Sequence, residues 1–312
     1  MRRRRVGGSG LSVSRLALGT WMWGTVVDDE TCRDLLAAYV EAGGTMLDSA
    51  YGYGLGAAES LVGRLVGDVV PRDDIVLCTK AGAYLRDGRH VRETSRAGML
   101  RHLDASLTRL GTDHVDLWLV HDWSDGAPLE ETMGALEYAV TSGRARYVGV
   151  SNYTGWQSAR AFSLLENARV PLVANQVEYS LVSRVIEDEL VPAAEALGFG
   201  LLAYSPLGGG VLTGKYRNGV PSGSRAAMRQ FPGFVRDRLD ADAMAVVEAV
   251  STAASGLGVS ATEVALAWVR DRPGVTAPVV GSRTVAQLRT ALASEELELP
   301  PEIVAALDEV SD

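Results

Sequence analysis

Four side chains in the amino-terminal part of the sequence could together transfer a proton. A carboxylate and a phenol lie in the segment L-D-S-A-Y-G-Y-G, an ammonium in C-T-K and an imidazole in L-V-H-D-W; they are Asp48, Tyr53, Lys80 and His121. The carboxylate, the ammonium and the imidazole each stand at the carboxyl end of a short apolar run typical of a β-strand, and the phenol lies just beyond the first run. Because the carboxyl ends of parallel barrel strands share one face, where active sites form, we expect these side chains to meet.

These four groups suit the protonation of a carbonyl oxygen while hydride arrives at its carbon. A free phenol has a pKa of about 10, so Tyr53 alone is a poor acid at neutral pH. Lys80 could favour the phenolate, and Asp48 would keep Lys80 charged and oriented. His121 could donate a hydrogen bond to a substrate oxygen or share the proton. Singly, each residue could instead be a cap, an edge residue or loop packing; their joint placement favours catalysis.

The elements that must position these groups alternate along the chain. Eight short apolar runs have the composition of buried parallel strands, at residues 15–19, 45–47, 75–78, 115–120, 147–150, 172–177, 199–204 and 275–280. Helical patterns lie between them, over residues 29–42, 100–110, 129–142, 156–167, 186–197 and 241–256. Expected helix ends are Gly43, Gly111, Gly143 and Gly198, and expected amino-terminal caps are Thr154 and Thr284.

This alternation predicts α/β architecture in a single domain over residues 1–312. The length and the strand count favour a closed (β/α)8 TIM barrel, with an amino-terminal β-hairpin turning at residues 7–10 and an extra carboxyl-terminal helix. A doubly wound open sheet is the alternative, against which no G-x-G-x-x-G follows the first strand. The long insertion at 208–239, rich in Gly, Arg and Pro, is expected to be a lid or a binding loop.

Composition excludes several classes of protein. The net charge of −9 argues against a nucleic-acid partner, and no apolar stretch is long enough to span a membrane. The basic residues 2–5 are not followed by the apolar region of a signal peptide, which predicts a cytoplasmic protein. Cys32 and Cys78 are too far apart for a metal motif, so we expect reduced thiols and no metal site. The sequence leaves open whether the protein is a monomer or a homo-oligomer.

The segments that carry the four groups resemble the catalytic segments of the aldo-keto reductases. The resemblance continues through G-V-S-N at 149–152, N-Q-V-E-Y at 175–179, A-Y-S-P-L at 203–207, G-V-L-T-G-K ending at Lys215 and G-S-R-T-V-A-Q at 281–287. It covers essentially the whole chain in order. It implies a nicotinamide-dependent carbonyl reductase in which the four residues form a catalytic tetrad with Tyr53 as the acid.

The same resemblance implies a cofactor site. Its residues would be Thr20 and Trp21; Ser151, Asn152 and Gln176 on the carboxamide; Tyr204 stacked on the nicotinamide ring; Ser205, Leu207 and Lys215 beside the pyrophosphate; and Gly281, Ser282, Arg283 and Gln287 at the start of the last barrel helix. Pairing of Arg283 with a ribose 2′-phosphate points to NADPH, the alternative being a solvated surface arginine. NADH remains possible, because Ala291 stands where relatives often have an adenine-contacting asparagine. The insertion at 208–239 would close over the pyrophosphate.

Three tryptophans could wall a substrate pocket. Trp21 and Trp23 follow the first barrel strand and Trp123 follows the fourth, which suits a flat or apolar carbonyl compound or a sugar. The alternative is that one or two of them pack the loops.

The leading prediction is therefore NADPH-dependent reduction of an aldehyde or ketone to an alcohol. The same site could instead oxidise a sugar or alcohol with NAD(P)⁺. A third possibility is a non-catalytic, cofactor-sensing subunit similar to the potassium-channel β subunits, against which the intact tetrad argues.

Overall fold

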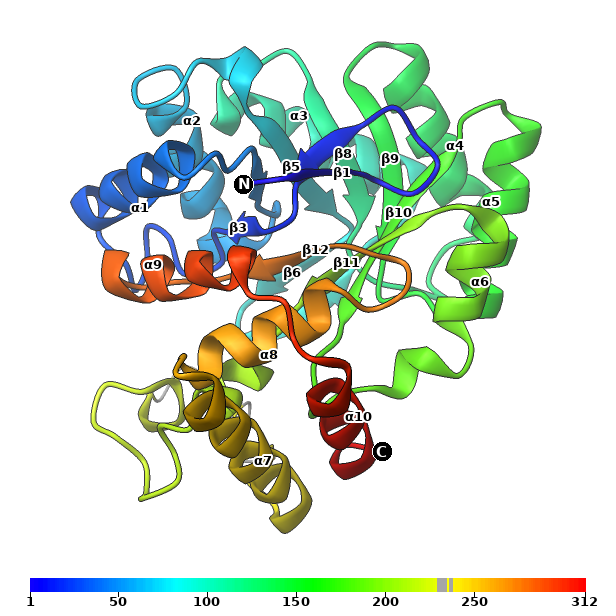
Figure 1. Cartoon of the computed structure of the whole chain (residues 1–312). Coiled ribbons are helices and arrows are strands. Elements are labelled where there is room, and N and C mark those ends of the chain that lie inside the picture. Colours follow the sequence, from blue (N-terminus) through cyan, green and yellow to red (C-terminus); the bar gives the residue numbers. More distant parts are fainter. Residues whose placement is uncertain (229–234, 236–237) are drawn as a thin grey trace.

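Parallel strands close into a barrel in the computed structural model, which describes residues 1–228, 235 and 238–312 (Figure 1). Among these residues eight strands form the barrel: β3 (Ala17–Gly19), β4 (Met46–Asp48), β5 (Val76–Ala81), β8 (Val115–Val120), β9 (Ala145–Ser151), β10 (Leu172–Glu178), β11 (Gly200–Tyr204) and β12 (Val275–Val280). Each pairs in parallel with the next, and β12 pairs with β3 to close the ring. The predicted TIM barrel is thereby confirmed, and the open sheet is excluded.

Helices follow the strands and form the outer layer. They are α1 (Asp29–Glu41), α2 (Ala57–Leu65), α3 (Arg96–Leu110), α4 (Leu129–Thr141), α5 (Gly155–Asn167), α6 (Leu190–Leu197), α8 (Ala261–Arg270) and α9 (Val285–Ala293). The side chains of Thr154 and Thr284 cap α5 and α9 as expected. The four glycines predicted at helix ends all have positive φ, between 64° and 82°.

Two of the barrel helices, α2 and α8, were not predicted from the sequence. Residues 241–256 were instead predicted to be the helix that follows β11. That segment is α7 (Ala241–Leu257), which packs against α8 and the extra carboxyl-terminal helix α10 (Pro301–Val310), whereas α8 packs on β12. A signal for α8 was present: Ser260 and Glu263 form a capping box at its start.

Two antiparallel hairpins lie outside the barrel. The predicted amino-terminal hairpin, β1 (Arg3–Arg5) with β2 (Ser12–Ser14), crosses in front of the barrel strands in Figure 1. Its side chains Val6, Leu11 and Val13 are buried with the residues that fill the barrel interior. The second hairpin, β6 (Ala83–Arg86) with β7 (Arg89–Arg92), follows β5 and was not predicted.

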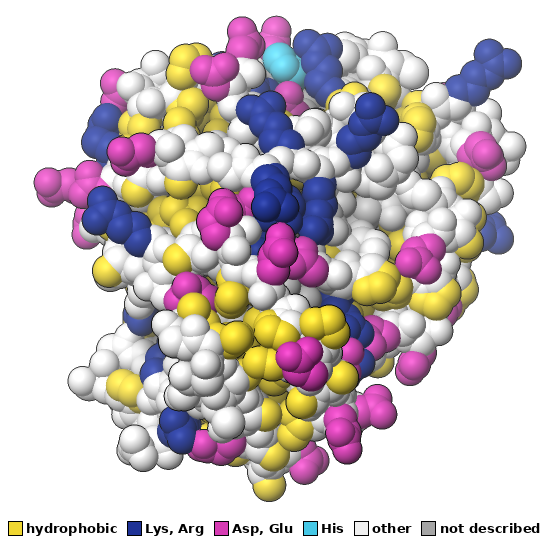
Figure 2. All heavy atoms as spheres, in the orientation of Figure 1, with side chains coloured by type: hydrophobic (Ala, Val, Ile, Leu, Met, Phe, Trp, Pro, Cys, Tyr) yellow, Lys and Arg dark blue, Asp and Glu magenta, His cyan; other side chains and the backbone are white. Residues whose placement is uncertain are grey.

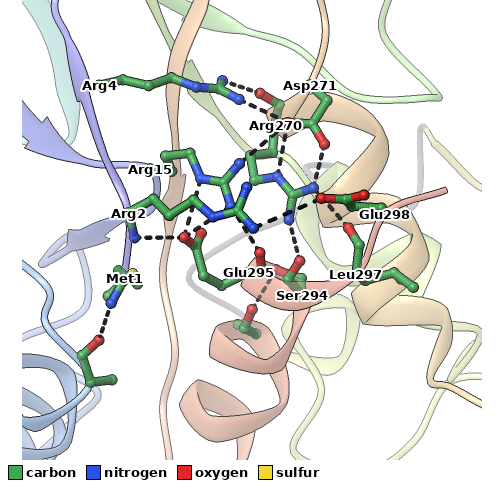
Figure 3. Close-up of polar contacts among 12 residues, drawn as sticks. Met1, Arg2, Arg4, Arg15, Arg270, Asp271, Ser294, Glu295, Leu297 and Glu298 are labelled. Atoms are coloured by element: carbon green, nitrogen blue, oxygen red, sulfur yellow. Dashed lines mark hydrogen bonds and ion pairs between the residues drawn. The ribbon is translucent and has the colours of Figure 1, made fainter.

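One buried ion pair and several hydrogen bonds attach the amino-terminal segment to residues 294–298, which follow α9 (Figure 3). Arg15 Nη2 lies 3.0 Å from Glu295 Oε1, and the same carboxylate oxygen accepts the backbone N–H of Arg2 at 2.8 Å. Arg270, which is 1% exposed, donates to the carbonyl oxygens of Ser294 and Leu297. These contacts hold β1, β2 and the segment after α9 together at the end of the barrel away from the tetrad.

Charges of both signs are interspersed over the face shown in Figure 2. Among the described residues no single helix is long and apolar enough to cross a membrane; α7 and α8 reach that length only as a pair bent by 103°. Cys32 and Cys78 are both free and buried.

Candidate active site

The four proton-transfer groups meet at the carboxyl end of the barrel. Asp48 ends β4, Lys80 lies near the end of β5, and His121 follows β8. Lys80 Nζ donates to both carboxylate oxygens of Asp48, at 2.9 and 2.8 Å, and lies 3.4 Å from the Tyr53 hydroxyl. The rings of Tyr53 and His121 are edge to face, with centroids 5.7 Å apart. The structure thus brings together all four residues named from the sequence.

Strand register explains why Lys80 reaches Asp48. Asp48 stands opposite Cys78 in the β4–β5 pair, and Lys80 lies two residues further along β5, so it shares the interior face of Cys78. Nζ also donates to the backbone oxygen of Ser49 at 2.8 Å. With four oxygens around it, counting the Tyr53 hydroxyl, and 0% exposure, the ammonium is held in one place.

The loop that carries Tyr53 depends on glycine. Gly56 has φ 97°, and a Cβ there would come within 2.4 Å of the Arg109 guanidinium carbon. Arg109 in turn donates to the buried Glu59, at 3.1 Å, and to the backbone oxygen of Tyr51, at 3.0 Å. This close approach packs the segment around Tyr53 against Arg109 of α3.

Burial determines the protonation state of each group. Burial raises the pKa of Tyr53 above its ordinary value of 10.0, although the Lys80 ammonium acts to lower it. Burial acts to lower the pKa of Lys80, but the Asp48 carboxylate, together with the Tyr53 and Cys78 groups, outweighs burial, and the pKa is raised. Burial, aided by the charge of Lys80, lowers the pKa of His121 to about 3. At neutral pH the site therefore holds a protonated phenol, an ammonium and a neutral imidazole.

This result corrects the sequence analysis on one point. From the sequence, only the attraction between the Lys80 ammonium and a phenolate was considered, and this attraction alone would lower the pKa of Tyr53. In the folded protein the cost of charging a buried phenol is larger, so the net direction is upward. Lys80 therefore limits the rise in the pKa of Tyr53 but does not reverse it.

The residues expected to hold a carboxamide lie beside the tetrad and are bonded to it. Gln176 Nε2 donates to Asp48 Oδ1 at 2.7 Å, and Asn152 Nδ2 donates to the backbone oxygen of His121 at 3.0 Å. The Tyr204 hydroxyl donates to Asn152 Oδ1 at 2.9 Å. Ser151 Oγ donates to the backbone oxygen of Gln176 at 2.7 Å. Amide and hydroxyl groups thus line the face next to the proton-transfer groups.

Three cations gather where a pyrophosphate was expected. Burial, together with the charges of Arg283 and Arg225, lowers the pKa of Lys215 to about 8. Burial and the charge of Arg283 likewise lower the pKa of Arg225 to about 10. Like charges held at close range in a partly buried site are relieved by a bound anion, which is the chemistry that a pyrophosphate or a 2′-phosphate would provide.

Arg225 was not named from the sequence. It lies in η5 (Arg225–Ala227), inside the insertion at 208–239, and its guanidinium carbon is 5.1 Å from the centroid of the Trp21 ring. The Arg-rich composition of the insertion was the available signal. Its position beside two predicted cofactor residues makes it a candidate third cation of the phosphate site.

Further expected cofactor residues lie at or just before the start of α9. Ser282, Arg283 and Gln287 lie at the start of α9, where the Arg283 N–H bonds to Gln287 Oε1 at 3.0 Å and the Arg283 side chain donates to the Gly223 carbonyl at 2.8 Å. A Cβ added to Gly281 would contact nothing within 4 Å, so the approach to this helix end is open. Such an end favours anions.

Three further expected cofactor residues lie after β11 and after β3. Ser205, which follows β11, has a positive φ of 51°, and the turn continues through Leu207 into η4 (Gly208–Thr213). Thr20 is buried, and its N–H and hydroxyl both donate to the backbone oxygen of Asp48, at 2.9 and 3.0 Å. Thr20 therefore positions Asp48 in addition to any contact with a cofactor.

The three tryptophans differ in what they can offer to a substrate. Trp21 is 37% exposed, whereas Trp23 is 1% exposed and belongs to the hydrophobic core. Trp123 packs edge to face on Tyr153 and Trp156, with centroids 5.0 and 5.3 Å apart. Trp23 fits the alternative in which a tryptophan packs the loops, while contact of Trp21 or Trp123 with a substrate stays a prediction.

Part of the expected lid lies outside the described residues. Of the insertion at 208–239, residues 229–234 and 236–237 are not described, so closure of this loop stays a prediction. Among the described residues no group of three or more His, Cys, Asp or Glu could hold a metal ion.

Known proteins match this chain over nearly its whole length. The model of the Aldo/keto reductase family matches residues 15–312. The chain is 36% identical to the uncharacterized oxidoreductase YrpG of Bacillus subtilis, over 98% of this chain and 94% of that protein. It is 33% identical to the L-glyceraldehyde 3-phosphate reductase of Escherichia coli O157:H7, over 99% and 92% of the two chains, and 33% identical to a probable voltage-gated potassium channel subunit beta of rice, over 99% and 96%. The chain is therefore an oxidoreductase that belongs to the aldo/keto reductase family.

Proposed function

We propose that this protein reduces a small aldehyde or ketone to an alcohol with NADPH. Aldo/keto reductases use nicotinamide cofactors and act on small carbonyl compounds. The observation that supports the proposal best is the protonated Tyr53 hydroxyl 3.4 Å from a charged Lys80, with a neutral His121 imidazole beside it. A neutral acid next to a fixed positive charge is what protonation of a developing alkoxide requires.

The side chains divide the work between them. When bound, the reduced nicotinamide supplies hydride to the carbonyl carbon. The O–H bond of Tyr53 breaks, and its proton goes to the carbonyl oxygen, so that C=O becomes CH–OH. Lys80 stabilises the phenolate that remains, and a proton from water then restores the phenol. Asp48 keeps Lys80 charged, and the neutral imidazole of His121 can donate an N–H to the substrate oxygen.

Two features support NADPH as the cofactor. The amide and hydroxyl groups of Ser151, Asn152 and Gln176 match a carboxamide, and Tyr204 offers a flat ring beside them. The mutually repelling cations Lys215, Arg225 and Arg283 match a pyrophosphate together with a 2′-phosphate. NADH lacks the 2′-phosphate and so would offer no such anion to Arg283.

The substrate is proposed to be small and polar. Two relatives in Escherichia coli are named L-glyceraldehyde 3-phosphate reductases, which makes short aldehydes the first compounds to test. Oxidation of a sugar or alcohol by the same groups is the second candidate, because the same proton transfer runs in both directions. A non-catalytic subunit of the channel type is a third candidate, because one relative in rice is named a probable channel subunit. The assembled tetrad argues against it, because such a subunit would not need proton-transfer groups. The cytoplasmic location and the oligomeric state stay predictions.

The decisive experiment is cofactor oxidation by wild type and Tyr53→Phe. Wild type should oxidise NADPH faster than NADH with glyceraldehyde or an activated aromatic aldehyde. Tyr53→Phe should bind NADPH with unchanged affinity, measured by fluorescence, but lose about 10²- to 10⁴-fold in kcat, because the proton donor is gone. Tyr138→Phe, at a tyrosine that is 43% exposed, is the matched control. Turnover that survives in Tyr53→Phe would refute the assignment.

A further inference from the structure

Asn152 links the end of β9 to β10, to the end of β11 and to the residue after β8. It follows β9, its Nδ2 donates to the backbone oxygen of His121 after β8, and its backbone N–H donates to Gln176 O in β10 at 3.0 Å. Its Oδ1 accepts the hydroxyl of Tyr204, the last residue of β11, at 2.9 Å. One side chain thus connects a tetrad residue to the aromatic ring proposed to stack on nicotinamide.

The backbone of Asn152 shows that this placement is constrained. Its φ is 60°, a left-handed conformation that non-glycine residues seldom adopt outside Asn and Asp. That conformation aims the amide back across the face toward His121. The cost of the left-handed backbone is offset by the hydrogen bonds that it allows.

The bonds of Asn152 can be counted atom by atom. Both hydrogens of Nδ2 are used, on His121 O at 3.0 Å and on Ser151 Oγ at 3.2 Å. Oδ1 accepts from Tyr204 and keeps one lone pair. The only capacity left for a carboxamide is therefore that lone pair on Oδ1. The hydrogen bond from the Tyr204 hydroxyl to Oδ1 holds the Asn152 amide in the orientation that presents this lone pair.

We propose that the hydroxyl of Tyr204 is a positioning group that acts through Asn152 on His121. The ring and the hydroxyl of Tyr204 would then have separate roles, because the ring contacts the cofactor and the hydroxyl fixes the Asn152 amide. Fixing that amide sets the His121 main chain, and with it the imidazole that lies edge to face with Tyr53. This inference rests on the proposed function for its kinetic consequences, but the link itself is a property of the chain alone.

Tyr204→Phe tests the hydroxyl without removing the ring. A neutral hydrogen bond corresponds to about a fivefold to tenfold effect. We expect kcat to fall by about that factor and the isotope effect with 4-deuterated NADPH to rise, because hydride transfer becomes more rate-limiting. NADPH affinity should stay within about twofold of wild type, since the ring is retained.

A double-mutant cycle with Asn152→Gly tests whether the hydroxyl acts through the amide. Glycine accepts the left-handed backbone at this position, so this variant removes the side chain without imposing strain. If Tyr204 acts through Asn152, adding Tyr204→Phe to Asn152→Gly should change kcat no further. Independent, multiplicative effects of the two substitutions would overturn the proposal.

A readout without cofactor separates this inference from the proposed function. Protein labelled with ¹³C at the histidine carbonyls has four such sites, and His121→Gln assigns one of them. The His121 carbonyl resonance should shift in Tyr204→Phe and in Asn152→Gly. It should not shift in Tyr179→Phe, a matched control that loses a hydroxyl bonded to Glu187 instead.

The outcomes are distinct. A wild type that reduces no carbonyl compound would refute the proposed function, while a shifted His121 resonance would still support the link. An unshifted resonance in Tyr204→Phe, or a loss of NADPH affinity with unchanged kcat, would show that the hydroxyl does not act through Asn152 on His121.

Discussion

Neutralising Asp48 should destabilise the fold through a charge left without its partner. Asp48 and Lys80 are 2% and 0% exposed, and the carboxylate accepts both contacts from Nζ. Asp48→Asn keeps an acceptor for Gln176 Nε2, so the substitution removes charge rather than shape. Breaking a buried ion pair from one side costs about 3–5 kcal/mol, against a total free energy of unfolding of about 5–15 kcal/mol.

The pH dependence has a defined sign. In wild type the folded-state pKa of Lys80 is raised above 10.5, so its contribution is complete below pH 10.5 and is lost as pH rises through the folded value. Without the Asp48 charge, burial is the dominant influence and lowers the pKa of Lys80. The ammonium then opposes folding at neutral pH, and this opposition weakens as pH rises toward 10.5. The stability difference between wild type and Asp48→Asn should therefore be largest near pH 7 and shrink above it.

Urea unfolding followed by tryptophan fluorescence at pH 7, 8.5 and 10 measures this difference. Asp68→Asn is the control: its ion pair with Arg33 joins side chains that are 56% and 49% exposed, so it should cost no more than about 1 kcal/mol. Asp48→Asn/Lys80→Met removes both charges and should recover part of the loss. A double variant no more stable than Asp48→Asn, or a difference that does not vary with pH, would refute the reasoning.

Two further predictions concern the cofactor and the far end of the barrel. Arg283→Gln should weaken NADPH binding by about 10- to 100-fold and leave NADH binding nearly unchanged, whereas Lys215→Met should weaken the binding of both cofactors. Calorimetric titration with each cofactor measures these affinities. Equal losses of NADPH and NADH affinity in Arg283→Gln would contradict the 2′-phosphate assignment. Glu295→Gln should lower the free energy of unfolding in urea by about 3 kcal/mol, because Arg15 loses its buried partner. Glu130→Gln, whose pair with Arg160 is exposed, is the control and should lower it by under about 1 kcal/mol. Similar losses in the two variants would show that the network in Figure 3 is not stabilising.

The sequence was sufficient to predict the barrel and its active face. Buried parallel strands are short, continuous apolar runs, so the eight strands were found and Asp48, Lys80 and His121 could be placed at their carboxyl ends. The two helices that were missed have weaker sequence signals. Helix α2 contains Gly63, and α8 begins only three residues after α7 ends, so the boundary between these two helices is hard to recognise from the apolar pattern. The strands of the β6–β7 hairpin have only four residues each, and β7 reads Arg-His-Val-Arg, without the apolar alternation of a half-buried strand.

The features that the sequence could not predict depend on distance and burial in three dimensions. Whether Lys80 or burial decides the pKa of Tyr53 depends on how much solvent the whole barrel mouth excludes, and no local pattern encodes that quantity. Arg225 is 58 residues from Arg283 along the chain, but the two charges repel each other in the fold. The bonds from Gln176 to Asp48 and from Asn152 to His121 cross between strands in the same way. Residue types therefore predicted which groups take part, but only the closed barrel determines that the phenol stays protonated and that residues named for the cofactor also position the tetrad.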